Sequence, residues 1–262
     1  MRQPAVWILL ASLSAAPAGA FTRSRDPDTR ACLWWETRQV RVLLNEACSA
    51  DLPRAQCETA VWASLAIWNE APCSDFQFLS GGLSSRTDVG FDEDHWDDNV
   101  NLILWTESSW RHDETAIAMT TTTYDRHTGQ VVDTDVELNG LSYTFTAIES
   151  PNVIVDIQNT LAHEAGHMLG LDHSSDPEAC MFATAPEGET KKRDLAQDDI
   201  DGVCHIYPTG QPIAACPGGP AIDPGGDGGC GQMPRSSGPS ALIWLLALGA
   251  IILRSRTHVS DS

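Results

Sequence analysis

Three histidines stand at the spacing that a metal site built on one short segment would need. His163 and His167 are four residues apart, so on a helix their rings lie on one face and can direct two nitrogens at the same ion. Gly170 follows one turn later, where a residue without a Cβ can end the helix in a left-handed conformation and turn the chain back. This turn would bring His173 to the ion as a third ligand.

The same segment carries a carboxylate that could act on a metal-bound water. Three protein ligands leave the fourth tetrahedral position of zinc to water, which is typical of a catalytic rather than a structural site. Zinc lowers the pKa of that water to about 7. Glu164 is adjacent to the first ligand and points off the metal axis, so it can take the proton. We therefore predict one catalytic Zn²⁺ held by His163, His167 and His173, with Glu164 as general base.

The alternative is that these histidines are ordinary surface or core residues of a helix. The short pattern His-Glu-x-x-His occurs by chance in some helical sequences, whereas the full pattern with the glycine and the third histidine is far rarer. We therefore favour the metal site.

Residues beyond the third histidine extend the pattern. Met181 stands eight residues after His173, and the intervening Ser-Ser-Asp-Pro-Glu-Ala-Cys is followed later by Leu195 to Val203 and by Ile206 and Tyr207. Together these segments resemble the metzincin zinc endopeptidases, and within them the matrixins. The family places a methionine in a tight turn below the metal, and Met181 stands at that position. The resemblance covers about residues 38–208, which we take as a matrixin-like zinc peptidase domain.

The resemblance implies both a fold and an activity. The fold is α+β (an α/β layer): a metzincin-like catalytic domain with a twisted, mostly parallel mixed sheet, an active-site helix and a C-terminal helix. The activity is zinc-dependent hydrolysis of peptide bonds in protein or peptide substrates, by a monomer. By the same resemblance, Ala116 to Thr120 would be an edge strand to which a peptide substrate adds as a further strand. An ordinary edge strand is equally compatible with these residues.

Several features of the family have no match here. The loop residues His112, Asp113 and His127 are too few and too scattered for a second, structural zinc, so we predict none. Ala183 stands where related subfamilies offer a tyrosine to the metal, so zinc ligation should stop at three histidines. The neighbours of Cys32 do not reproduce the family's inhibitory cysteine motif, and we prefer a disulfide for that cysteine.

Hydrophobic patterns predict where the remaining elements lie. A helix is expected from about Asp51 to Glu70, capped by Asp51, with Val61, Leu65 and Trp68 on its inward face. Strands are expected over residues 39–44, 76–79, 99–105, 115–124 and 131–138.

The start of the chain and its cysteines indicate export. Residues 1–20 hold an apolar run and end in Ala-Gly-Ala, as a cleaved signal peptide would, followed by an N-terminal segment over residues 21–37. Eight cysteines suit an oxidising compartment, since the zinc pattern uses none. Six could form three bridges, with Cys180 and Cys204 as a sensible local pair; the alternative is that some are free buried thiols. The six are Cys32, Cys48, Cys57, Cys73, Cys180 and Cys204.

The formal charge of −20 makes nucleic acid and anionic membrane surfaces poor partners. Acidic residues crowd one loop, and three more alternate along a predicted strand so that they share one face. Hard oxygen ligands at this density suit Ca²⁺, although a solvated acidic surface is the alternative. The loop residues are Asp88, Asp92, Glu93, Asp94, Asp97 and Asp98, and the strand residues are Asp133, Asp135 and Glu137.

Beyond Pro208 the composition changes. Residues 209–240 form a Gly/Pro-rich linker, 241–253 a short apolar C-terminal helix, and 254–262 a basic tail. Thirteen residues at about 1.5 Å each fall short of the hydrocarbon core of a bilayer. The arrangement resembles a bacterial C-terminal sorting tag with Cys230 as its processing site; a plain anchor or a buried helix are the alternatives. Membrane contact is expected only through this segment, in a protein that is secreted or attached to the cell surface or envelope.

A different class of function has also to be considered. A non-catalytic, exported metal-binding or adhesion module on the same fold would explain the export signal and the acidic loops. Such a module would have no use for Glu164 beside a metal ligand, and we therefore favour the enzyme.

Overall fold

The computed structural model describes residues 21–147 and 152–216, together with the backbone of residues 252–256. The order of elements follows that of a mixed α+β domain, as predicted. The helices are α1 (Arg54–Asn69), α2 (Ile157–Leu169) and α3 (Gln197–Ile206), with short 3₁₀ turns at Trp96–Asp98 and Lys191–Arg193. The strands of the main sheet are β2 (Gln39–Asn45), β3 (Gln77–Ser84), β4 (Asn101–Thr106), β5 (Ala118–Asp125), β6 (Val131–Asn139) and β10 (Ile252–Arg256).

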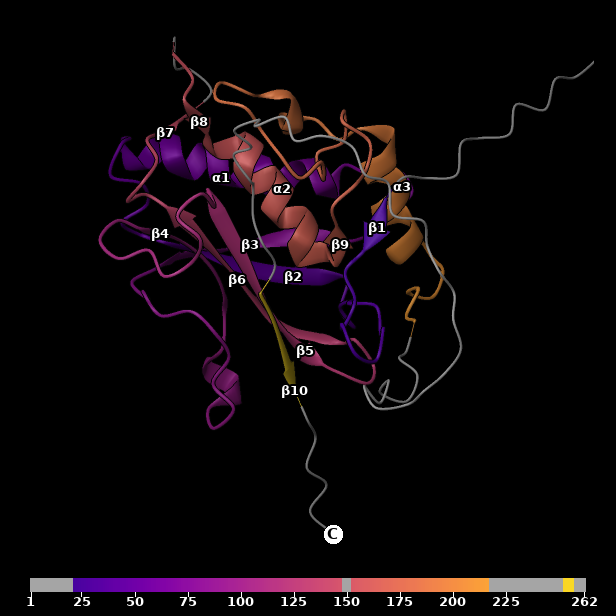
Figure 1. Ribbon diagram of the computed structural model, residues 1–262. Coiled ribbons are helices and arrows are strands. Elements are labelled where there is room, and N and C mark those ends of the chain that lie inside the picture. The colour runs from indigo at the N-terminus through magenta and orange to yellow at the C-terminus, as the bar shows by residue number, and fades with distance from the viewer. Residues whose placement is uncertain (1–20, 148–151, 217–251, 257–262) are drawn as a thin grey trace, which may run out of the picture.

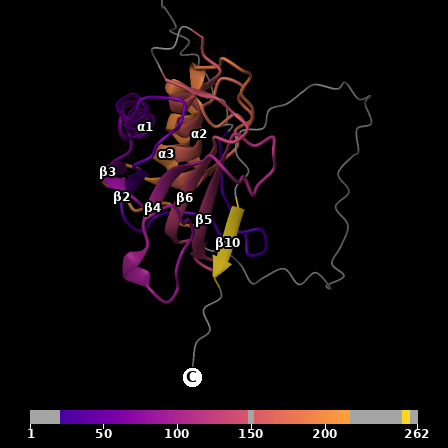
Figure 2. The ribbon, with the colours of Figure 1, turned by 90° about the vertical axis from the view of Figure 1, so that its left-hand side faces the viewer.

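The main sheet has the strand order β10-β5-β6-β4-β2-β3. Only β5 and β6 pair antiparallel; the other neighbours are parallel, which confirms the mostly parallel mixed sheet. The helices α1 and α2 lie on the same side of this sheet (Figures 1 and 2). Two small two-stranded pairs complete the domain: β1 (Thr22–Arg23) with β9 (Leu171–Asp172), and β7 (Phe145–Thr146) with β8 (Val155–Asp156).

The core lies between the sheet and the helices. Along β2 the side chains of Val40, Val42 and Leu44 are buried while Arg41 is exposed, as expected for a strand with one covered face. The predicted inward face of α1 is confirmed, since Val61, Leu65 and Trp68 are all buried. Trp68 also donates a hydrogen bond from Nε1 to the Ala162 carbonyl of α2, at 2.9 Å. This contact fixes α1 against the helix that carries the histidines.

The start of α1 differs from the prediction. The helix begins at Arg54, with Pro53 as the preceding residue, rather than near Asp51. The carboxylate of Asp51 does not cap it, because its Oδ2 accepts a hydrogen bond from the Phe145 amide at 2.8 Å. Asp51 therefore joins the segment before α1 to the β7 strand, a contact between segments far apart in the sequence.

The disulfides correct one predicted pairing. Cys204 is bonded to Cys73 rather than to Cys180, and Cys180 is a buried thiol with no disulfide partner among the described residues. The other bridges are Cys48–Cys57 and Cys32–Cys216. The predicted disulfide for Cys32 is confirmed, with a partner that lies beyond the expected domain boundary.

The chain after Pro208 also differs from the prediction where it is described. Residues 209–216 pack on the domain: the Ala214 amide donates to the Ile206 carbonyl at 2.9 Å, and Cys216 holds Cys32. The linker and the apolar segment otherwise lie outside the described residues, as do the signal peptide and Cys230. Ile252 and Leu253 end the predicted helix but belong to β10, which pairs parallel to β5 from Thr121 to Asp125. The edge of a sheet offers backbone hydrogen-bond partners to a strand of any sequence. A hydropathy pattern therefore cannot predict that a segment will pair there.

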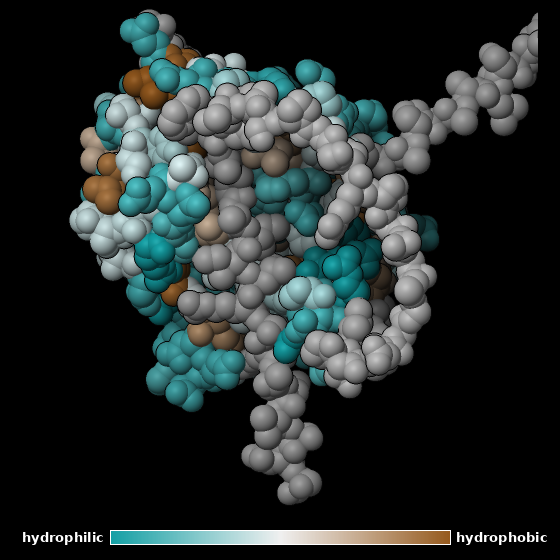
Figure 3. All heavy atoms as spheres, in the orientation of Figure 1, coloured by the Kyte–Doolittle hydropathy of each residue, from teal (hydrophilic) through white to brown (hydrophobic). Residues whose placement is uncertain are grey.

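Among the described residues that are visible in Figure 3, polar ones are the more numerous and hydrophobic ones are scattered between them. Among the helices of the described residues, none is long and apolar enough to cross a bilayer.

Candidate metal centre

The helix α2 places the first two histidines in the centre of the domain. It begins after Asp156, whose Oδ1 accepts a hydrogen bond from the Asn159 amide at 2.8 Å and so caps the first turn. It ends at Gly170, which has φ 98° and ψ 17°, as the sequence predicts for a glycine in the left-handed region. A Cβ at that position would lie 2.5 Å from the Leu33 carbonyl oxygen, so the turn also needs the smallest residue for space.

The last turn of α2 is held by two long-range hydrogen bonds. Trp35 donates from Nε1 to the Met168 carbonyl at 2.7 Å, and Tyr207 donates its hydroxyl proton to the Leu169 carbonyl at 2.9 Å. Both carbonyls belong to the end of the helix, which has no intrahelical donors for them. The strand β9 follows directly and pairs with β1, Thr22 opposite Asp172. These contacts fix the direction in which the chain leaves the helix and hence the position of His173.

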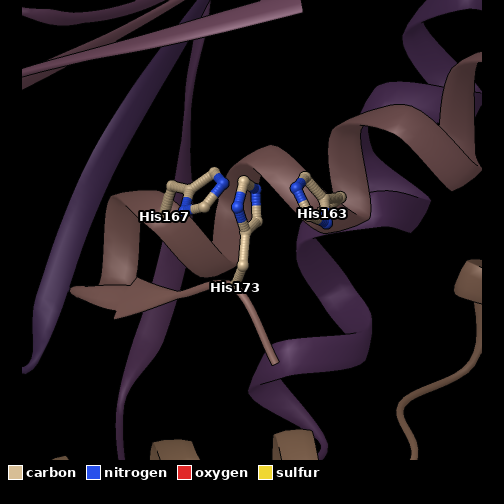
Figure 4. A group of neighbouring side chains, drawn as sticks. All are labelled: His163, His167 and His173. Atoms are coloured by element: carbon tan, nitrogen blue, oxygen red, sulfur yellow. The ribbon is translucent and has the colours of Figure 1, made fainter. Parts of the chain in front are cut away.

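The structure brings the three predicted ligands together. Figure 4 shows the rings of His163 and His167, from α2, and of His173, after β9, directed at one another. Their potential ligand atoms all lie within 4.8 Å of one another. The ring centroids are 4.8 Å apart for His163 and His167, 5.2 Å for His163 and His173, and 4.9 Å for His167 and His173.

Hydrogen bonds at the far side of two rings define which nitrogen faces the centre. His163 Nδ1 lies 2.7 Å from the Cys180 carbonyl oxygen, and His167 Nδ1 lies 2.9 Å from that of Leu171. Because a carbonyl can only accept, each Nδ1 carries the proton and each Nε2 presents a lone pair. This is the arrangement in which metal-binding histidines are normally oriented by a second group.

The inward atoms lack partners among the described residues. Nε2 of His163, His167 and His173 and Oε1 of Glu164 are buried and make no hydrogen bond there. Buried polar groups are nearly always paired, so three such nitrogens that converge, with a fourth unpaired atom on the same helix, indicate a ligand or water. Three neutral imidazoles and a nearby carboxylate suit Zn²⁺, which accepts nitrogen ligands and leaves room for water.

Electrostatics keeps the imidazoles neutral. Burial, the nearby Lys192 ammonium and the two neighbouring rings hold the pKa of His163 well below its ordinary value. Burial lowers the pKa of His167 to about 3 and also lowers that of His173. Since a metal ligand must be deprotonated, these shifts prepare the site for a cation.

Glu164 lies on α2 against the strand β5. Its Oε2 accepts a hydrogen bond from Thr120 Oγ1 at 2.6 Å, while Oε1 is left over. Burial raises the pKa of Glu164 to about 7. A carboxyl group with a pKa near neutrality can both accept and release a proton, as general acid–base chemistry requires. Thr120 belongs to the segment that the resemblance assigned to the substrate edge, so the structure places that edge beside the predicted base.

Met181 lies directly below the histidine helix. Gly166 has room for no side chain, because a Cβ there would collide with Met181 Sδ and would lie 2.9 Å from Trp68 Cζ2. The backbone of the turn is held by Asp199 of α3, whose carboxylate accepts from the amides of Cys180 at 2.7 Å and Met181 at 3.0 Å. Met181 Sδ therefore lies against α2 between the two histidines, and Asp199 is an anchor that the sequence reasoning did not identify. A position of Met181 below the metal stays a prediction.

Sequence reasoning missed the residues that position the ligands from a distance. Thr120, Asp199, Trp35 and Tyr207 act through contacts between segments far apart in the chain. The one signal available was the position of Asp199 in the first turn of a predicted helix, where a carboxylate is expected to find backbone donors.

The remaining candidate ligands have other partners. His112 Nε2 lies 2.9 Å from Glu137 Oε2, which Arg111 also contacts at 2.8 Å. His127 is exposed in the turn between β5 and β6, and the carboxylate of Asp113 accepts from the Thr115 amide and hydroxyl. Asp135 accepts from the amides of Gly90 and Leu102, at 2.6 Å and 2.9 Å. Among the described residues, the three histidines of the centre form the one group of three or more with metal-binding geometry.

Two buried carboxyl groups on β6 should make stability depend on pH. Burial and the charge of Asp135 raise the pKa of Asp133 to about 8, and burial raises that of Asp135 to about 6. A raised pKa means that the folded form binds more protons, so stability is lost as the pH rises from about 4 towards 8. We expect Asp133→Asn to unfold at a higher urea concentration than the wild type at pH 8. Its free energy of unfolding should be larger by on the order of 2 kcal/mol at pH 8, and by less at pH 5.

Asp94→Asn, in the exposed acidic loop, is the matched control and should change the free energy of unfolding neither at pH 8 nor at pH 5. A destabilised Asp133→Asn variant at pH 8 would contradict the explanation by burial. The same variants test the predicted calcium: if Ca²⁺ stabilises the wild type, Asp133→Asn should lose that gain.

The comparisons with known proteins agree with this geometry. The family model described as Matrixin matches residues 34–208, more than half of the 262 residues. A metalloendoproteinase of Arabidopsis thaliana, 5-MMP, is 40% identical over 84 residues, which is 32% of this chain and 19% of the relative. Human neutrophil collagenase is 29% identical over 161 residues, 60% of this chain and 30% of the relative. Human matrilysin is 49% identical over 45 residues, 17% of each protein.

The chain therefore aligns with only a third or less of the length of these relatives. The match nevertheless includes the histidine helix, the turn at Met181 and the closing helix α3, the elements that build the centre. This chain belongs to the matrixin family.

Proposed function

We propose that the protein is an exported zinc-dependent endopeptidase that hydrolyses peptide bonds in protein or peptide substrates. The observation that carries the proposal is the convergence of the ligand atoms of three histidines whose buried Nε2 atoms have no partner among the described residues. The buried carboxyl group of Glu164, adjacent to the first ligand on the same helix, has an oxygen without a described partner as well. A binding-only module would gain nothing from a carboxyl group kept beside the ligands with its pKa near 7. The names of the relatives, metalloendoproteinases, a collagenase and a matrilysin, support the same class of reaction.

The residues divide the work as follows. His163, His167 and His173 would hold one Zn²⁺, which when bound polarises the scissile carbonyl and activates water. Glu164 accepts the proton of the attacking water at Oε1 and delivers it to the leaving amine, while Thr120 holds its other oxygen. The substrate backbone pairs with the edge of β5 at Ala118 to Thr120, which lies beyond the part that β10 covers and has no strand partner on that side among the described residues. Gly166 and Met181 keep the ligand-bearing helix and the turn below it in contact.

The proposal extends to where the protein acts. The predicted signal peptide over residues 1–20 and three disulfides support an oxidising, extracytoplasmic location. The C-terminal segment is proposed as a sorting tag that leaves the peptidase secreted or attached to the envelope. We propose a monomer that acts on peptide chains and not on nucleic acid, in keeping with its charge of −20. Calcium at the carboxylates of β6 stays a prediction.

Metal analysis of the purified full chain, combined with a hydrolysis assay on casein or gelatin, tests the proposal. We expect one zinc per chain and cleavage that a chelator abolishes and added zinc restores. A chain that holds zinc but cleaves no unfolded protein would favour the non-catalytic alternative, an exported metal-binding or adhesion module. Cleavage that is insensitive to chelation would contradict the role of the metal.

A further inference from the structure

A cavity of about 240 Å³ lies at the start of α2, one helical turn from the proposed general base. Thr160 lines it, and Thr160 and Glu164 are four residues apart, so their side chains lie on the same face of the helix. Ile117 also lines it and directly precedes the part of β5 that β10 leaves unpaired. The cavity is smaller than most ligand pockets, which hold roughly 300 Å³ or more. It is therefore placed, and sized, to take one side chain of a peptide bound along β5.

The walls of the cavity combine apolar surface with negative charge. Ile117, Val155 and Ala185 give it buried apolar walls. Three carboxyl groups also line it, from Asp156, Glu187 and Glu189, and its lining residues include no lysine, arginine or histidine. A side chain with an apolar stem would bury against these walls, and the charge at its end would meet carboxylates.

The first of the three carboxylates is already neutralised. Arg193 holds Asp156 through two hydrogen bonds, from Nε at 2.8 Å and from Nη2 at 2.5 Å. Asp156 also caps α2 through the Asn159 amide. The helix start would by itself favour an anion, but this carboxylate already meets that preference. The charge of Asp156 is therefore already balanced, and the other two carboxylates determine which charge the cavity favours.

Glu189 is the carboxylate with capacity for a further partner. Its side chain is only 10% exposed, so water screens its charge weakly. The charge of the Lys192 ammonium interacts with that of Glu189. Oε1 accepts one long hydrogen bond, from Asn159 Nδ2 at 3.5 Å, and Oε2 forms an ion pair with Lys191 Nζ at 3.7 Å, which is beyond hydrogen-bond distance. The Lys191 ammonium donates instead to the Pro177 carbonyl. Since a carboxylate can accept about four hydrogen bonds, Glu189 can bind a donor that enters the cavity.

Glu187 contributes less, because it is exposed and its charge is screened by water and salt. We propose that the cavity selects a cationic substrate side chain, lysine or arginine, at a position flanking the scissile bond, and that Glu189 is the residue that selects it. This inference rests on the proposed peptidase activity and adds to it the class of bond that is cleaved.

The test compares two peptides that differ only in charge at one position. The zinc-loaded full chain is given peptides with lysine or with norleucine, its uncharged analogue, at each of the two residues that flank the scissile bond. We expect kcat/KM to be about tenfold higher for lysine at one of these positions, as for a hydrogen bond to a charged group. In Glu189→Gln the ratio of kcat/KM for the lysine peptide over the norleucine peptide should fall to within about twofold.

Matched variants separate selection from folding. Glu178→Gln removes an exposed acid outside the cavity and should keep the full preference. Glu189→Asp keeps the negative charge and should retain part of the preference for lysine. This variant still tests the inference if Glu189→Gln folds poorly. Equal cleavage of both peptides by the wild type, or an unchanged preference in Glu189→Gln, overturns the inference and leaves the peptidase proposal intact. Absence of any cleavage, of casein as well as of both peptides, overturns both.

Discussion

Glu164→Gln should leave zinc in place and lower kcat/KM for peptide hydrolysis by about 10²–10⁴-fold. Glutamine has the shape of the glutamate and can still accept the hydrogen bond that Thr120 donates at 2.6 Å. It cannot take a proton from water, so only the acid–base step is removed. Because the three histidine rings are untouched, metal content should remain at the wild-type level. The measurement is zinc analysis and peptide hydrolysis on the same preparations.

The zinc-free protein offers a second readout of the same residue. Burial raises the pKa of Glu164 from 4.5 to about 7, so the folded zinc-free form holds this proton more tightly than the unfolded chain. Its contribution to stability is present below pH 4.5 and is lost as the pH rises through about 7. Glu164→Gln removes that loss, and the variant should be more stable than the wild type at pH 8 without zinc.

Glu178→Gln, on the exposed loop before Met181, serves as control and should behave as the wild type in both assays. Retention of full activity by Glu164→Gln would remove the general-base assignment. Loss of zinc together with activity would show that this residue supports the metal rather than the proton transfer.

The ligand set could be predicted because its geometry is local. His163, His167 and Gly170 belong to one helix and its cap, where residue spacing alone decides which side chains share a face. His173 follows within one short strand, so the turn at Gly170 determines its approach. Four residues of the segment could thus be placed without knowledge of the rest of the fold.

The partners of these residues could not be predicted in the same way. Thr120 and Asp199 reach the centre from β5 and α3, whose positions depend on sheet order and helix packing. The disulfides show the same limit: Cys180 and Cys204 are near one another in sequence, yet Cys204 pairs with Cys73, 131 residues away. The hydrophobic pattern located β2, β4, β5 and β6 to within three residues, but it ended β3 five residues early and did not predict the short strands. Contacts between distant segments form only in the assembled domain, so the pattern could not predict them.

His173→Ala is expected to abolish zinc binding at equimolar metal and, with it, peptide hydrolysis. Changes to groups that merely orient a ligand lower metal affinity about 10–100-fold, so loss of a ligand should cost at least about 100-fold. Of the three ligands, His173 is the best choice for this test because it lies outside α2 and is only half-buried, whereas His163 and His167 are packed inside the helix layer. The zinc-free variant should therefore fold as the wild type does, which circular dichroism can verify.

Thermal unfolding distinguishes the loss of metal from a loss of fold. Zinc in excess of its Kd stabilises a folded protein that binds it, by about 2.7 kcal/mol at one hundred times Kd. Zinc should therefore raise the Tm of the wild type and of the control His127→Ala, whose ring is exposed in the turn between β5 and β6. It should not raise the Tm of His173→Ala. His173→Ala protein that still gained stability from zinc and still cleaved casein would show that two histidines suffice, and the three-ligand centre would have to be abandoned.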